Sequence, residues 1–140
     1  MVDRDSGESP MILAITQEMT GKMREFGYAG NDMSFALNQF VEELEKIDGY
    51  SAVGFLYDDS SLDRPMILVD MIFKPDDRFD HGQVDRVHEA HQKFSQSIED
   101  RLYSFMDWHE PEPGIDAQGL LAEIAKKEGS KTLAILEKAA

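Results

Sequence analysis

The segment that decides the fold reads Met66-Ile67-Leu68-Val69-Asp70-Met71-Ile72-Phe73. Side chains point alternately to two faces along a β-strand, so this segment has two distinct sides. One side is entirely apolar and predicts a strand packed on the core. The other side is apolar except for Asp70, and we expect it to be only partly covered, or covered by another subunit. A carboxylate among apolar neighbours needs a partner, which makes Asp70 a candidate functional residue.

Helical and extended segments surround this strand in a definite order. Apolar periodicity predicts helices over 10–26 and 35–47, followed by a first strand over 50–57. A long amphipathic helix follows the second strand, from Gln83 to about Phe105. A short extended piece, 106–110, comes next, and the prolines just after it forbid further helix. The tail then returns to helical periodicity.

This order predicts an α/β (α+β) two-layer sandwich: a small open sheet of about three strands with helices on one face, and extra N- and C-terminal helices. We divide the chain into an N-terminal extension with an amphipathic helix (1–34), a central domain (35–113) and a C-terminal helical tail (114–140). Three strands with one partly bare apolar face bury too little surface. Dimerisation, or cover from the terminal helices, would supply the missing burial.

The net charge of the chain limits the kinds of molecule that it is expected to bind. It holds 28 acidic and 14 basic residues, a net charge of −14. Such a field disfavours nucleic-acid binding and attracts cations and basic protein surfaces, although it also serves solubility alone. No apolar run approaches the roughly 20 residues of a membrane span. We therefore expect a soluble, cytoplasmic protein with no direct membrane insertion.

Imidazoles and carboxylates are the candidate metal ligands, because the chain has no cysteine. They suit Zn²⁺, or alternatively Mn²⁺, Fe²⁺ or Co²⁺, rather than Cu⁺. His88 and His91 lie one turn apart on the predicted helix, so both can converge on one ion. The alternatives without metal are a packed helix histidine at position 91, an ion-pair partner for Asp70 and an exposed acidic loop at 109–112. The candidate ligands are Asp70, His88, His91, His109, Glu110 and Glu112.

Two other kinds of site are disfavoured by the residue pattern. The loop before the long helix holds Asp76, Asp77, Asp80 and His81, but Arg78 stands where an EF-hand needs an oxygen ligand. We interpret that loop as solvated. No cysteine nucleophile, phosphate-cradling glycine loop or Ser-His-acid motif is present, so we expect no enzyme. A three-ligand site that activates water is the remaining catalytic alternative.

Five short motifs follow one another over residues 35–113. They are a helix ending in Glu45-Lys46-Ile47-Asp48-Gly49-Tyr50, a first strand over 52–57, the strand Leu68-Val69-Asp70-Met71-Ile72, the triplet Glu89-Ala90-His91 and the closing Trp108-His109-Glu110-Pro111. Their order and spacing resemble the C-terminal cytosolic domain of the cation diffusion facilitator (CDF) family, which transports divalent metals. The resemblance covers a little over half of the chain.

The resemblance implies a ferredoxin-like fold, a homodimer and a divalent-metal site that regulates transport. Asp70 and His91 match positions of the family's ligands, whereas Gly54 stands where some members place a strand histidine. The six-helix transport domain has no counterpart in this sequence. We expect a metal-binding, dimerising regulatory domain, with a membrane transporter as a further candidate partner. The alternative is an acidic protein-binding module, such as a secretion chaperone or an immunity protein, whose eight methionines give an adaptable surface.

Overall fold

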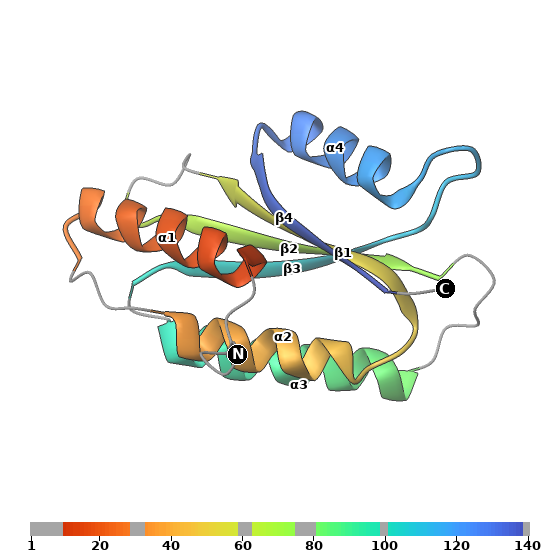
Figure 1. The fold of residues 1–140 in the computed structure, drawn as a ribbon, viewed down its shortest axis with the longest axis horizontal. Helices are drawn as coiled ribbons and strands as arrows, with labels where there is room; N and C mark the ends of the chain where they lie inside the picture. The colour runs from red at the N-terminus through yellow and green to blue at the C-terminus, as the bar shows by residue number, and fades with distance from the viewer. Residues whose placement is uncertain (1–9, 29–32, 59–62, 75–80, 99–100, 139–140) are drawn as a thin grey trace, which may run out of the picture.

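The structure is a computed structural model that describes residues 10–28, 33–58, 63–74, 81–98 and 101–138. Within these ranges the helices and strands follow one another along the chain as Figure 1 shows. The elements are α1 (Pro10–Glu25), α2 (Ser34–Glu45), β1 (Tyr50–Asp58), β2 (Met66–Phe73), α3 (His81–Ile98), β3 (Tyr103–His109), α4 (Ala117–Glu128) and β4 (Lys131–Glu137).

The described strands form one open sheet in the order β3-β2-β1-β4. Strand β1 is antiparallel to both β2 and β4, whereas β2 and β3 are parallel. A parallel pair cannot be joined by a tight hairpin, and α3 supplies the crossover between β2 and β3. The mixed α/β architecture with an open sheet is as predicted, whereas the number of described strands is four rather than about three.

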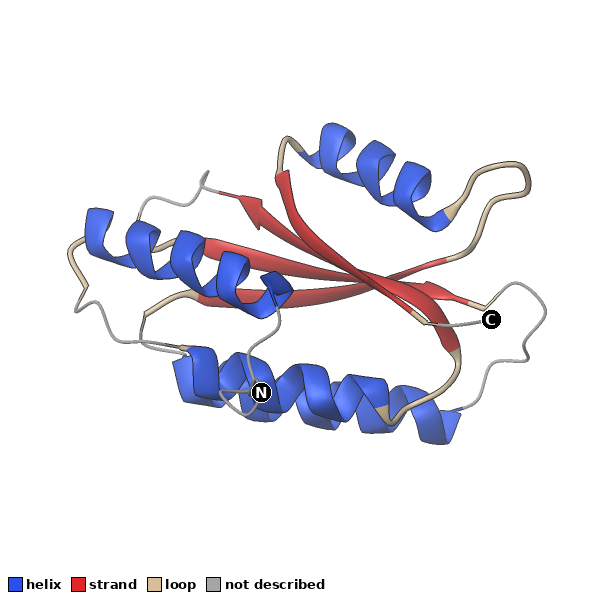
Figure 2. Ribbon diagram, in the orientation of Figure 1, coloured by secondary structure: helices blue, strands red, loops and turns tan. Residues whose placement is uncertain are grey.

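One face of the sheet carries the main core. Helices α2 and α3 run alongside each other over this face, and α1 packs against α2 and the edge strand β4 (Figures 1 and 2). The apolar side of β2 points into this core, as its alternation predicted. The buried residues include Ile15, Met19, Leu37, Phe40, Val53, Phe55, Ile67, Val69, Met71, Val87, Phe94 and Ile98.

Helix α4 packs on the opposite face of the sheet, here called the second face, so helices lie on both faces (Figure 2). Cover of this face by a terminal helix is one of the two alternatives that the sequence left open. Leu121 and Ile124 of α4 pack with Leu56 and Ile72 in a second apolar cluster. Gly54 makes this close approach possible, because a Cβ atom at that position would lie 2.9 Å from Leu121 Cδ2.

Two expectations are corrected in the C-terminal half. The sheet has a fourth described strand, β4, where the sequence predicted helix, because Gly129 (φ 71°) ends α4 and the chain then pairs with the free edge of β1. Helix α3 ends at Ile98 rather than near Phe105, which lies in β3 beside Leu68. Phe105 is 51% exposed, so α4 leaves the β3 side of the second face uncovered.

Candidate metal centre

The candidate metal site consists of Asp70, Asp107 and His109, on the neighbouring strands β2 and β3. In the parallel register Asp70 lies beside Asp107, and Ile72 lies beside His109. Because residues two apart on a strand share a face, all three site residues point to the second face of the sheet. Each offers one ligand atom, and these atoms lie within 4.8 Å of one another.

Asp70 is the buried member of this site. Its side chain lies at the centre of the sheet and the residue is 1% exposed. One carboxylate oxygen, Oδ1, lies 2.7 Å from Nε2 of His109. The other, Oδ2, is buried and has no hydrogen-bond partner among the described residues. An acceptor left in this state costs about 1–3 kcal/mol, and a bound cation would remove that cost.

Electrostatics at the site favours a cation. Burial raises the pKa of Asp70, the hydrogen bond and charge of His109 oppose this rise, and the nearby Asp107 adds to it. Glu128, the last residue of α4, also has a raised pKa, first through burial and then through the charge of Asp70. Within the site, two carboxylates are held close together with one imidazole, an arrangement typical of a site that binds a positive ion.

The site has the donor types that bind divalent transition metals. Two carboxylates and one imidazole are ligands that Zn²⁺, Mn²⁺, Fe²⁺ and Co²⁺ accept. Asp70, Asp107 and His109 can therefore hold a metal ion. The sequence prediction included Asp70 and His109 but missed Asp107. The available signal was its position two residues before His109, which places both side chains on one face of a strand.

The two helix histidines lie across the sheet from this site. His91, on α3, is half-buried beside the Phe40 ring, and its Nε2 lies 2.7 Å from the Ser104 hydroxyl. Ser104 pairs with Ile67 on the core side, whereas Asp70 points to the α4 side. Within one chain, Asp70 and His91 are therefore not brought to a common ion. Burial lowers the pKa of His91, and the nearby His88 lowers it further.

The other predicted ligands stand apart from the site. His88 is exposed on α3, with its ring 6.5 Å from that of Trp108 on the core side of β3. Glu110 and Glu112 are exposed beyond the end of β3 and do not belong to the group of close ligand atoms. The acidic residues of the 75–80 loop and the side chain of His81 lie outside the described part of the chain.

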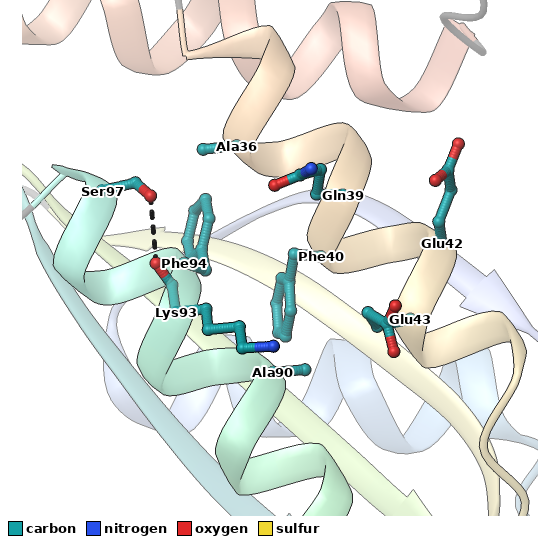
Figure 3. A pocket seen from close by; sticks show the side chains of 9 residues that line it. All are labelled: Ala36, Gln39, Phe40, Glu42, Glu43, Ala90, Lys93, Phe94 and Ser97. Carbon is teal, nitrogen blue, oxygen red and sulfur yellow. Dashed lines mark hydrogen bonds between the residues drawn. The ribbon is translucent and has the colours of Figure 1, made fainter.

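A groove runs between α2 and α3 on the outer side of the helical layer, with a volume of about 170 Å³. Figure 3 shows the Phe40 ring of α2 beside the Phe94 ring of α3; their centroids are 5.1 Å apart in a stacked arrangement, and both residues are buried. Polar and charged side chains surround these rings. The lining residues are Ala36, Gln39, Phe40, Glu42, Glu43, Ala90, Lys93, Phe94 and Ser97.

Comparison with known proteins found no similar protein. No family model, curated protein or solved structure matches the chain. Among the described helices, none combines the length and the apolar character needed to cross a membrane.

Proposed function

We propose that this chain is a divalent-metal-binding regulatory domain that holds its ion through Asp70, Asp107 and His109. The observation that carries the proposal is the buried Oδ2 of Asp70, which has no hydrogen-bond partner among the described residues and lies beside two further ligands. A buried acceptor is normally paired, and a cation is the partner that a carboxylate beside another carboxylate would favour.

The physical consequence of binding is a link between strands. Asp70 lies on the central strand β2, whereas Asp107 and His109 lie on the edge strand β3. An ion shared by the three would neutralise the repulsion between the two aspartates and hold β3 to β2. The role that we propose is binding and regulation, because an ion that favours one arrangement of β2 and β3 shifts the population toward it.

The resemblance to the CDF cytosolic domain supports this proposal. The order α2-β1-β2-α3-β3 is compatible with a ferredoxin-like arrangement, and Asp70 matches the position of the family's strand ligand. We further propose that two copies pair through the uncovered β3 side of the second face, around Phe105. Pairing would bury this exposed aromatic ring beside the half-buried Leu68.

Isothermal titration calorimetry with Zn²⁺ and with Mn²⁺ tests the metal site. Wild type is compared with the Asp70→Asn and His109→Gln variants, and with His91→Gln as a histidine variant from the opposite face of the sheet. We expect both site variants to lose at least about tenfold in affinity and His91→Gln to bind like wild type. Binding by Asp70→Asn equal to that of wild type would remove the proposed site.

A second candidate function is the capture of a basic protein segment by the α2–α3 groove. The observation that favours it is a pocket over the buried rings of Phe40 and Phe94, lined also by Glu42 and Glu43 and by one cation, Lys93. Phe35 is 75% exposed on the same helix. Together with the net charge of −14, this surface complements an amphipathic helix that carries lysine or arginine.

Amide NMR during titration with a synthetic basic amphipathic peptide tests this second function. We expect the shifts to be confined to residues 35–43 and 90–97, and to be reduced in Glu43→Lys. The matched control is Glu123→Lys, which changes the same charge on exposed α4. Shifts that spread over the whole acidic surface would indicate attraction by net charge alone and contradict a defined groove site.

A further inference from the structure

Glu128 is the last residue of α4, the helix that packs on the second face of the sheet. Helix α4 turns Leu121, Ile124 and Ala125 toward the sheet, and all three are buried. Residue 128 is four positions after Ile124 and three after Ala125, so it continues the same stripe by one turn. This stripe packs against the part of β1 that includes Gly54, the residue paired with Asp70.

The surroundings of Glu128 agree with this placement. Its pKa is raised by burial and then by the charge of Asp70, with further effects from His109, Asp107 and Asp58. All three members of the candidate site thus act on this one carboxylate. Glu128 is nonetheless exposed, and its carboxylate is not among the ligand atoms that lie within 4.8 Å of one another.

The three strand ligands leave one side of an ion open. Asp70, Asp107 and His109 all rise from adjacent strands of one sheet, so they can contact an ion only from the sheet side. Structural zinc sites usually have four protein ligands, and the missing position lies on the side of the ion away from the sheet. The buried Oδ2 of Asp70, which has no hydrogen-bond partner among the described residues, is independent evidence that a cation binds here.

We propose that Glu128 is the fourth ligand of this site, so that the ion binds α4 to strands β2 and β3; the inference rests on the metal-binding function proposed above. The completed site has three carboxylates and one imidazole, an oxygen-rich set that suits Mn²⁺, Fe²⁺ or Zn²⁺. The C-terminal helix then becomes the element that responds to metal, because one of its own side chains enters the coordination sphere.

Titration of the full chain with Mn²⁺ tests the role of Glu128. The variants are Glu128→Gln, which keeps the shape and removes the charge, and the control Glu123→Gln, which removes the same charge from an exposed position on α4. Each titration is run in 0.1 M and in 1 M salt, because the screening length falls from about 10 Å to about 3 Å between them. Hydrogen exchange over residues 117–137 is measured with and without Mn²⁺.

We expect Glu128→Gln to bind Mn²⁺ at least about tenfold more weakly than wild type at both salt concentrations, while Glu123→Gln binds normally. Mn²⁺ should slow hydrogen exchange in α4 of wild type but not of Glu128→Gln. Equal weakening by both variants, or weakening that disappears in 1 M salt, would overturn the inference because it indicates only long-range attraction. Wild type that binds no metal would instead refute the metal-binding function itself.

Discussion

Replacing Asp70 by asparagine should stabilise the protein in a chelator and abolish its response to metal. Asparagine has the same shape as aspartate without the charge. In the native protein Asp70 is buried, and its Oδ2 has no hydrogen-bond partner among the described residues. The amide oxygen of asparagine can still accept the hydrogen bond from His109, so the substitution removes the buried charge and retains that contact.

The pH dependence of this gain follows from the raised pKa of Asp70, whose ordinary value is 3.8. Because this pKa is raised, the folded state binds the proton of the Asp70 carboxyl more tightly than the unfolded state does. Stability therefore falls as the pH rises from 3.8 through the folded-state pKa. The gain from asparagine should be complete above that folded-state pKa and disappear below about pH 3.8.

The magnitude can be worked from burial and chain length. An unsatisfied buried acceptor costs about 1–3 kcal/mol, and we take the lower end, about 1 kcal/mol, because the asparagine amide is also polar. A chain of 140 residues has an unfolding entropy of about 0.3 kcal/mol per kelvin, so the variant should melt about 3 °C higher. Metal at 100 times its Kd stabilises wild type by about 2.7 kcal/mol, or about 9 °C.

Thermal unfolding followed by circular dichroism at pH 7 measures both effects. Wild type and Asp70→Asn are compared in chelator and in saturating Mn²⁺. Asp85→Asn, an exposed position on α3, is the matched control and should behave like wild type in both conditions. Two results would refute the reasoning: a variant that melts well below wild type in chelator, or a variant that keeps the full metal-dependent increase.

Three further predictions test other parts of the molecule. Burial lowers the pKa of His91 below 6.5, so the unfolded state binds the proton first and stability falls as the pH drops from 6.5 through the folded-state pKa. The free energy of unfolding of His91→Gln, measured in urea, should depend less on pH over this range. The same pH dependence in variant and wild type would contradict this prediction. Gly54→Val should destabilise by about 1–3 kcal/mol through its contact with Leu121, whereas Gly21→Ala, which meets open space in α1, should stabilise by about 0.5–1 kcal/mol. If Gly54→Val proved more stable to urea than Gly21→Ala, the close packing of α4 on β1 would be contradicted. Phe105→Asp should convert a dimer to a monomer in sedimentation equilibrium, and a wild type that is monomeric at every concentration would remove the dimer proposal.

Local pattern was enough to identify β2 and the unusual position of Asp70. The alternation of apolar residues around Asp70 has a period of two, and this period follows from strand geometry alone. The structure confirms that the fully apolar side of β2 lies in the core. The periodic helices over 10–26 and 35–47 were likewise predictable, because an apolar stripe every three or four residues is a property of the helix itself.

The tail shows where local pattern becomes ambiguous. Leu133, Ile135 and Leu136 fit one face of a helix and also a short buried strand. Their state depends on a free strand edge that β1 offers from about 80 residues earlier in the chain. Nothing near residue 133 in the sequence specifies that edge, so the strand emerges only when the sheet is assembled.

By itself the sequence determined the strand that carries Asp70, the ligand chemistry available without cysteine and the strong negative charge. Tertiary structure decided which groups meet that carboxylate. The parallel register of β2 and β3 brought Asp107 and His109 to it, while the crossover helix α3 carried His91 to the other face. The physical reason is that side-chain direction is set within a strand or helix, whereas register and the face a helix covers are set by contacts between segments distant in sequence.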